Sequence, residues 1–191
     1  MQFAVLMSIC ILILAVTTAL DAPCARVNVT PFGGAFMALC VIALVRFVLE
    51  PCPEFRINAA AGFLPVFFLF GTIFKRGRVL EKSSILLLFT SVAYTASVAI
   101  VKDANPALLL CIGSALVAAF LHESPLFSMF VASLVPLIGP VFYACYELYV
   151  FGYASCNLGA AYVLDAQLVG VISTTVAAYL FGVRSAQPEN T

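Results

Sequence analysis

The sequence predicts an all-α protein, a polytopic transmembrane helical bundle of six to seven spans. Hydrophobic residues make up 64% of the 191 residues and charged residues only 9%, with a mean hydropathy of +1.14. Soluble domains carry about 25% charged residues. The apolar residues come in runs that approach the ~20 residues of a bilayer span, separated by Pro, Gly and charged turns. After these turns, the chain has no room for a separate soluble domain.

The densest basic cluster sets the predicted orientation. It comprises Lys75, Arg76, Arg78 and Lys82. Basic residues in short loops stay on the cytoplasmic side of a membrane, so the apolar run before this cluster is predicted to enter from outside and end inside. Alternation then places Arg26 and Arg184 inside as well, and the N-terminus outside.

Apolar runs predict seven helices, at residues 2–20, 34–50, 57–74, 84–101, 107–121, 126–151 and 160–183. No basic stretch precedes the first helix, which favours a retained helix over a cleaved signal peptide. We therefore expect a single integral membrane domain over residues 1–191. Its parts are an additional N-terminal helix at 1–20, a six-helix bundle at 33–183 and a polar tail at 184–191.

Prolines and tyrosines mark two of the predicted helices. Pro65 lies inside the helix at 57–74, and such a proline is tolerated where a neighbouring helix or polar side chain takes up the freed carbonyl. The stretch from Pro136 to Pro140 predicts a structural kink, which we favour over a broken helix that lines a substrate path. The tyrosines that follow predict an aromatic belt at the membrane interface. They are Tyr143, Tyr146, Tyr149 and Tyr153.

A small set of charged residues predicted at the outer end of the bundle supplies the candidate substrate-binding residues. They are Arg46, Glu50, Arg56, Glu147 and Asp165. Arg46 and Glu50 are four apart on the helix predicted at 34–50, so they share a face and can pair. Charged groups in spans normally face partners, cavities or water, which predicts an outward-facing polar pocket. The alternative is a structural pair, with the two other acids in the headgroup region.

No catalytic residue, metal site or cofactor is predicted. The sequence holds seven cysteines without a CxxC and a single histidine, His122, so no ligand spacing for a metal occurs. It also lacks HExxH, GxSxG and Walker patterns. Packing is the favoured role of the cysteines, and a disulfide between Cys52 and Cys156 is the alternative. The formal net charge of zero gives no support for nucleic-acid binding.

One segment, residues 46–71, carries a family resemblance. The residues that match the pattern are Phe55, Arg56, Ile57, Gly62, Phe63, Leu64, Pro65 and Gly71. The segment resembles the opening of substrate-binding S-components of energy-coupling factor vitamin transporters. This resemblance implies a helical membrane bundle with a substrate pocket on its outer side and a partner subunit that supplies energy. The N-terminal helix has no counterpart in it, and Gly34 and Ala38 match the docking motif only in part.

The first functional hypothesis is membrane transport or binding of a small solute through the outward-facing polar pocket. Its predicted setting is multi-pass in the cell (inner) membrane, with the lipid bilayer, the solute and other membrane subunits as partners. The alternative is a non-catalytic subunit or assembly factor that docks through small-residue helix faces. An enzyme is least favoured, because its best acid pair, Glu147 and Asp165, lacks a recognisable partner.

Overall fold

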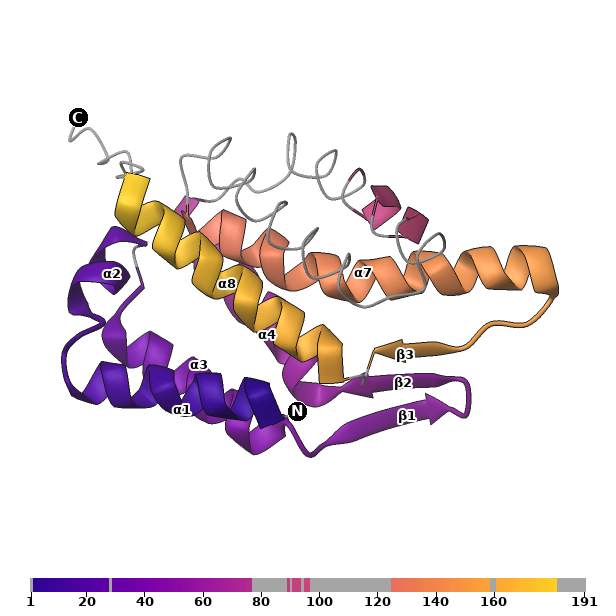
Figure 1. Cartoon of the computed structure of the whole chain (residues 1–191), viewed down its shortest axis with the longest axis horizontal. Coiled ribbons are helices and arrows are strands. Elements are labelled where there is room, and N and C mark those ends of the chain that lie inside the picture. Colours follow the sequence, from indigo (N-terminus) through magenta and orange to yellow (C-terminus); the bar gives the residue numbers. More distant parts are fainter. Residues whose placement is uncertain are drawn as a thin grey trace.

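The structure is a computed structural model that describes residues 2–27, 29–76, 89, 91–93, 95–96, 125–158 and 161–181. Over these residues the chain is mostly helical, with a small sheet at one end of the helices (Figure 1). A mostly helical fold is therefore confirmed, whereas the three-stranded sheet departs from the all-α prediction. The helix predicted at 107–121 lies outside the described residues, as does the helix at 84–101 apart from the helical positions 89, 91–93 and 95–96.

Three helices form the N-terminal part: α1 (Gln2–Val16), α2 (Asp21–Arg26) and α3 (Pro31–Leu44). α1 ends before residue 20, as the chain adopts the left-handed conformation at Thr18 (φ 59°). α3 starts after Thr30, whose side-chain oxygen accepts a hydrogen bond from the Gly33 N–H at 3.0 Å. A threonine cap followed by Pro31 favours a helix start. α1 and α3 pack against each other.

A β-hairpin follows α3, where the sequence predicted the last turns of a helix. Its strands are β1 (Val48–Cys52) and β2 (Phe55–Asn58). The prediction of a helix through residue 50 was wrong. Pro51 has no N–H to donate and disfavours the helical conformation of the residue before it, so Glu50 is extended. A third strand, β3 (Cys156–Leu158), pairs in parallel with β2 and completes the order β1-β2-β3.

Asn58 connects the hairpin to the next helix, α4 (Ala59–Arg76). Its Oδ1 accepts from the Ala60 N–H at 2.9 Å and its Nδ2 donates to the Val45 carbonyl at 2.7 Å. Asn58 is buried, and it satisfies backbone groups at the start of α4 and just past the end of α3 together. This one side chain sets where α4 begins relative to α3.

The two longest helices of the described part are α7 (Pro125–Phe151) and α8 (Ala161–Phe181). Together with α4, they confirm the helices predicted at 57–74, 126–151 and 160–183. Among the described residues, two segments could cross a membrane by length and composition: Pro125–Phe151 and Tyr162–Leu180. The apolar helices Phe3–Val16, Pro31–Leu44 and Ala59–Ile73 are shorter. Membrane association is thus supported by two helices.

α7 packs against both α4 and α8 (Figure 1). Its contact with α8 depends on Gly170. A Cβ atom at Gly170 would lie 3.1 Å from the Cβ of Ala132, which is tighter than an ordinary contact. A small residue in each helix therefore lets the two backbones approach closely.

Candidate functional site

The hairpin places two of the predicted site residues in contact with each other. The Nε of Arg56 lies 3.1 Å from the Oε1 of Glu50, and the two side chains are 53% and 50% exposed. They come from paired strands, where opposite residues have neighbouring side chains. Arg46 lies between α3 and β1 and is exposed. The predicted pairing of Arg46 with Glu50 on one helix was therefore wrong, because the helix ends at Leu44.

Glu147 and Asp165 come from two different helices. Glu147 lies in the last two turns of α7 and is partly exposed, while Asp165 lies in the second turn of α8 and is also partly exposed. β3 lies between the end of α7 and the start of α8 in the chain. The structure thus brings Glu50 and Arg56 together. It places Glu147 and Asp165 on two separate helices, α7 and α8.

A cavity of the described part lies elsewhere, between α1, α2, α3, α4 and α8, with Met129 of α7 in its lining. Its volume is about 580 Å³, within the range of ligand pockets, which is about 300–1,000 Å³. The lining includes none of the five predicted site residues. It is instead formed by side chains such as Leu6, Met37, Phe68, Val171 and Leu180.

The cavity is apolar from its floor to its rim. On the floor, Met37, Met129 and Val171 are buried, while Leu6 and Leu180 at the rim are 59% and 67% exposed. The hydroxyl of Thr175, a polar residue of the lining, donates to a carbonyl of its own helix at 2.9 Å. The lining therefore offers contact to hydrocarbon and few groups to bind a polar solute.

Two cysteines, Cys10 and Cys24, also line the cavity. Cys24 is buried, and burial raises the pKa of its thiol above the ordinary value, with a second contribution from the negative charge of Asp21. Since the thiolate is the reactive form, Cys24 is poorly nucleophilic at neutral pH. Cys24 is therefore suited to packing. Because it lines the cavity, the rate at which a reagent labels its thiol measures access to the cavity.

The small residues Gly34 and Ala38 of α3 are used inside the chain. A Cβ atom at Gly34 would lie 4.0 Å from the Sγ of Cys24, and Gly34 also lines the cavity. Ala38 is fully buried. Within the described part of the chain, both residues are therefore buried, and Gly34 packs against α2.

A buried polar contact that the sequence did not predict joins α8 to both α4 and α7. The Nε2 of Gln167 donates to the Ala61 carbonyl at 2.9 Å and to the Ser133 carbonyl at 2.6 Å. Pro65 stands four residues after Ala61 and has no N–H to donate to it. The signal in the sequence was a lone Gln within an apolar helix, but its partners are 106 and 34 residues away.

The alternative disulfide between Cys52 and Cys156 is excluded by the strand register. Cys52 pairs with Phe55 on one side, and Cys156 pairs with the same Phe55 on the other. Two strand spacings are about 9–10 Å, and a disulfide needs Cα atoms within about 7 Å. Cys156 is a free thiol. Within the described ranges, no group of three His, Cys, Asp or Glu residues is placed to hold a metal ion.

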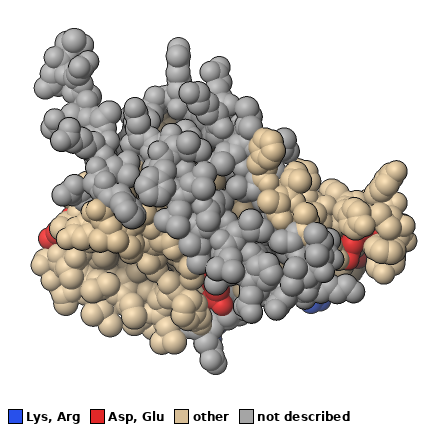
Figure 2. Space-filling model, turned by 45° about the horizontal axis from the view of Figure 1, so that its top comes forward, with Lys and Arg blue, Asp and Glu red and all other residues tan. Residues whose placement is uncertain are grey.

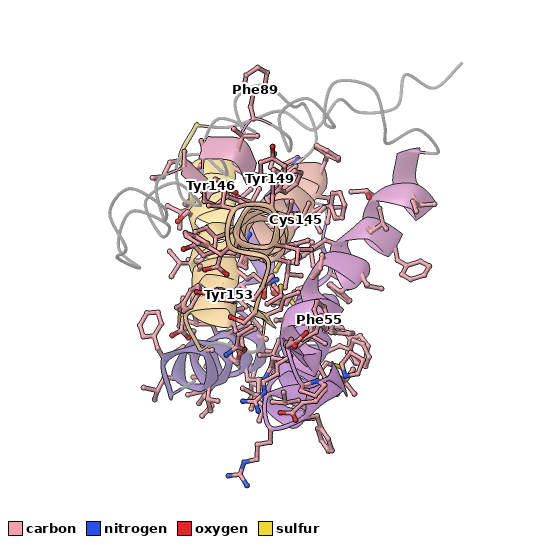
Figure 3. The ribbon with its side chains drawn as sticks, turned by 90° about the vertical axis from the view of Figure 1, so that its right-hand side faces the viewer. Phe55, Phe89, Cys145, Tyr146, Tyr149 and Tyr153 are labelled. Atoms are coloured by element: carbon pink, nitrogen blue, oxygen red, sulfur yellow. The ribbon has the colours of Figure 1, made fainter. Side chains whose placement is uncertain are left out.

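The surface around these features carries little charge. On the face shown in Figure 2, the described residues are mostly uncharged, with a few small acidic patches and one small basic patch. At the far end of α7, Tyr146 and Tyr149 lie on the side of the helix away from Phe55 of the sheet, whereas Tyr153 lies nearer the sheet (Figure 3). Tyr149 is 90% exposed.

No protein-family model, curated protein or solved structure matches this chain. The resemblance of residues 46–71 to S-components therefore stays a prediction. The residues that match the pattern lie in β2 and in α4.

Proposed function

We propose that this chain is a multi-pass integral membrane protein of the cell (inner) membrane that binds a lipid-like solute. The hydrocarbon part of the solute lies in the cavity between α1, α2, α3, α4 and α8. The observation that carries the proposal is the apolar lining of this cavity, which continues into an apolar, exposed rim.

Apolar side chains on the outside of the helices support a lipid environment. α1 exposes the large apolar residues Phe3, Leu6, Ile9, Ile13 and Val16, which recur every three to four residues along one side of the helix. α3 likewise exposes several large apolar residues. In water this surface would be unfavourable by about 25 cal/mol for each Å². In a bilayer it is not, so the shorter helices α1, α3 and α4 are proposed as further spans of a six- to seven-span bundle.

The length of α7 supports an interfacial position for its aromatic end. Its 27 residues extend about 40 Å, whereas the hydrocarbon core of a bilayer is about 30 Å thick. About 10 Å, or the last two turns, therefore extends beyond the core. These turns hold Tyr146 and Tyr149, amphipathic side chains that favour the headgroup layer.

The rim of the cavity supports a hydrocarbon chain as the occupant. Leu6, Val176 and Leu180 are apolar residues of the rim and are exposed. An opening bordered in this way is favourable toward lipid and unfavourable toward water. A solute can thus enter sideways from the bilayer, with its polar group left at the headgroup layer.

A cavity-filling substitution tests the proposal directly. Val176→Trp places a large ring at the rim, and Val66→Trp is the matched control, since Val66 is similarly exposed on α4 but does not line the cavity. The probe is cis-parinaric acid, a fluorescent fatty acid, titrated into protein in a mild detergent. We expect V176W to weaken binding at least tenfold and V66W to leave it unchanged. Equal binding by both variants would refute an acyl-chain site in this cavity.

A different set of variants separates this proposal from the outward-facing polar pocket. That hypothesis predicts that Arg46→Ala or Glu147→Ala abolishes solute binding. Neither residue lines the cavity, so the acyl-chain proposal predicts unchanged fatty-acid binding in both. Loss of binding in R46A or E147A, with V176W unaffected, would favour the polar pocket.

A further inference from the structure

Cys145 and Cys156 lie on the two arms of one chain reversal. α7 ends at Phe151, and Gly152 adopts a positive φ of 75°, a conformation that glycine reaches without strain. The chain then turns back and enters β3 at Cys156. The backbone of Cys156 is fixed there, because its N–H donates to the Glu54 carbonyl at 2.8 Å.

The dimensions of the two arms allow the two cysteines to lie at the same level. From Cys145 to Phe151 the helix rises about 9 Å. From Gly152 to Cys156 an extended chain returns at most about 13 Å. β3 also packs against α7, so the two arms are neighbours. In the view along α7, Cys145 lies on the same side as Phe55, the strand partner of Cys156 (Figure 3).

The two thiols differ in access and are near enough to influence each other. Both are free, Cys145 is exposed and Cys156 is partly buried. Burial raises the pKa of Cys156, and the negative charge of a Cys145 thiolate raises it further. A reagent from solution therefore reacts first with the exposed Cys145. The partly buried Cys156 reacts second, with Cys145.

We propose that Cys145 and Cys156 form a redox-responsive pair that closes to a disulfide in the presence of a small-molecule disulfide. The Cys145 thiolate attacks one sulfur of the oxidant, which forms a mixed disulfide and releases one thiolate of the reagent. The Cys156 thiolate then attacks Cys145 Sγ, which forms the Cys145–Cys156 bond and releases the second thiolate. The two cysteine protons pass to the released thiolates, so the reagent is reduced to two thiols and the cysteine pair is oxidised.

The bond would fasten the end of α7 to the edge of the sheet. It would enclose residues 146–155, which include the exposed Tyr149 and Tyr153. Without the bond, this end of α7 is linked to the sheet through the turn at Gly152 and through packing on β3. Oxidation would thus hold the aromatic end of α7 in a fixed position over the sheet.

The test uses the full chain in detergent, reduced, freed of reductant and titrated with oxidised glutathione. Free thiols are then blocked with N-ethylmaleimide, and the protein is digested with chymotrypsin. Tyr146, Tyr149, Phe151 and Tyr153 lie between the two cysteines, so cleavage separates them into peptides that only a disulfide can join. We expect Cys145 and Cys156 to lose their free thiols while neither retains a bound glutathione, and we expect a joined pair of peptides that contains both cysteines.

Two variants and a control make the result decisive. Cys156→Ser should lose one thiol and keep one glutathione on Cys145, because the second attack cannot occur. Cys145→Ser should abolish the joined peptides, and Cys40→Ser, on α3, should leave them unchanged. The proposal is overturned if the unaltered chain keeps glutathione on Cys145 as the C156S variant does. It is equally overturned if Cys156 joins to another cysteine.

Discussion

The side-chain amide of Gln167 donates at 2.9 Å to the carbonyl of Ala61, the carbonyl that Pro65 leaves without its helical donor. Gln167 is fully buried and belongs to α8, whereas Ala61 belongs to α4. An unsatisfied carbonyl in an apolar interior is costly, so this contact allows a proline inside α4. The same amide donates to Ser133 of α7, which joins three helices through one side chain.

Gln167→Leu is therefore expected to destabilise the fold. The substitution introduces an apolar side chain of similar size but leaves the Ala61 carbonyl without a donor. We expect a loss of about 1–2 kcal/mol in the free energy of unfolding, the range for buried hydrogen bonds, including those between membrane helices. Unfolding of the detergent-solubilised protein by sodium dodecyl sulfate, followed by circular dichroism, measures it.

A double-mutant cycle of Gln167 and Pro65 measures the coupling between the two residues. In the Q167L background, Pro65→Ala restores an N–H that can donate to Ala61, so it should recover part of the lost stability. Thr175→Ala is the control for the loss of a side-chain hydrogen bond that does not join two helices, since the Thr175 hydroxyl donates within α8. If P65A has the same effect with and without Gln167, the two residues are not coupled.

This contact shows what sequence alone could and could not supply. The need for a donor near Pro65 follows from proline chemistry, and it was predicted. The identity of the donor was not, because Gln167 is 106 residues from Ala61 and its position depends on how α8 packs on α4. Long apolar helices such as α7 are likewise readable from composition, whereas their mutual contacts are not.

Gly170→Ala is expected to push α8 away from α7. The new Cβ would meet the Cβ of Ala132 at 3.1 Å, and the Ala132 carbonyl oxygen at 3.4 Å limits how far the helix can shift. Overpacking of this kind typically destabilises by about 1–3 kcal/mol. Gly71→Ala is the control, since its Cβ would lie an ordinary 3.8 Å from Leu126. A smaller effect at Gly170 than at Gly71 in the same unfolding assay would contradict the close packing.

The hairpin marks the place where sequence reasoning failed. The apolar run continues past Leu44 into Val48 and Leu49, so hydrophobicity alone extended the helix to Glu50. The strand depends on Pro51 and on pairing with residues after the turn, which are non-local. The partner of Glu50 is consequently Arg56 across the hairpin, and Arg46 is left outside that pair.

The ion pair of the hairpin should contribute little to stability. Both side chains are about half exposed, and exposed pairs are worth about 0–1 kcal/mol. Arg56→Ala is therefore expected to change the unfolding free energy by less than about 1 kcal/mol, with a smaller change at high salt. An effect as large as that of Q167L, in the same assay, would show that the pair has a role beyond the hairpin.

Asn58→Ala should be far more damaging than Arg56→Ala, although the two residues are two apart on β2. Asn58 is buried, its Oδ1 caps α4 and its Nδ2 donates to the Val45 carbonyl. Loss of a cap costs about 1 kcal/mol and an unsatisfied buried carbonyl about 1–3 kcal/mol more. Asn58→Asp retains the acceptor and loses the donor, so its loss of stability should fall between that of N58A and that of R56A. Equal stability of N58A and R56A would overturn this account of the α3–α4 junction.

The reactivity of Cys24 should depend on Asp21, three residues earlier on α2. Burial is the larger cause of its raised pKa, and the Asp21 carboxylate adds to it by disfavouring a second negative charge nearby. Asp21→Asn removes that charge, so the pKa of Cys24 should fall toward its ordinary value and the thiolate fraction at pH 8 should rise. We expect N-ethylmaleimide to label Cys24 severalfold faster in D21N, as measured by peptide mass spectrometry across pH 7–10. Glu54→Gln, in the hairpin, is the control and should not alter the rate. Slower labelling in D21N at every pH would mean that Asp21 acts on Cys24 by some route other than its charge.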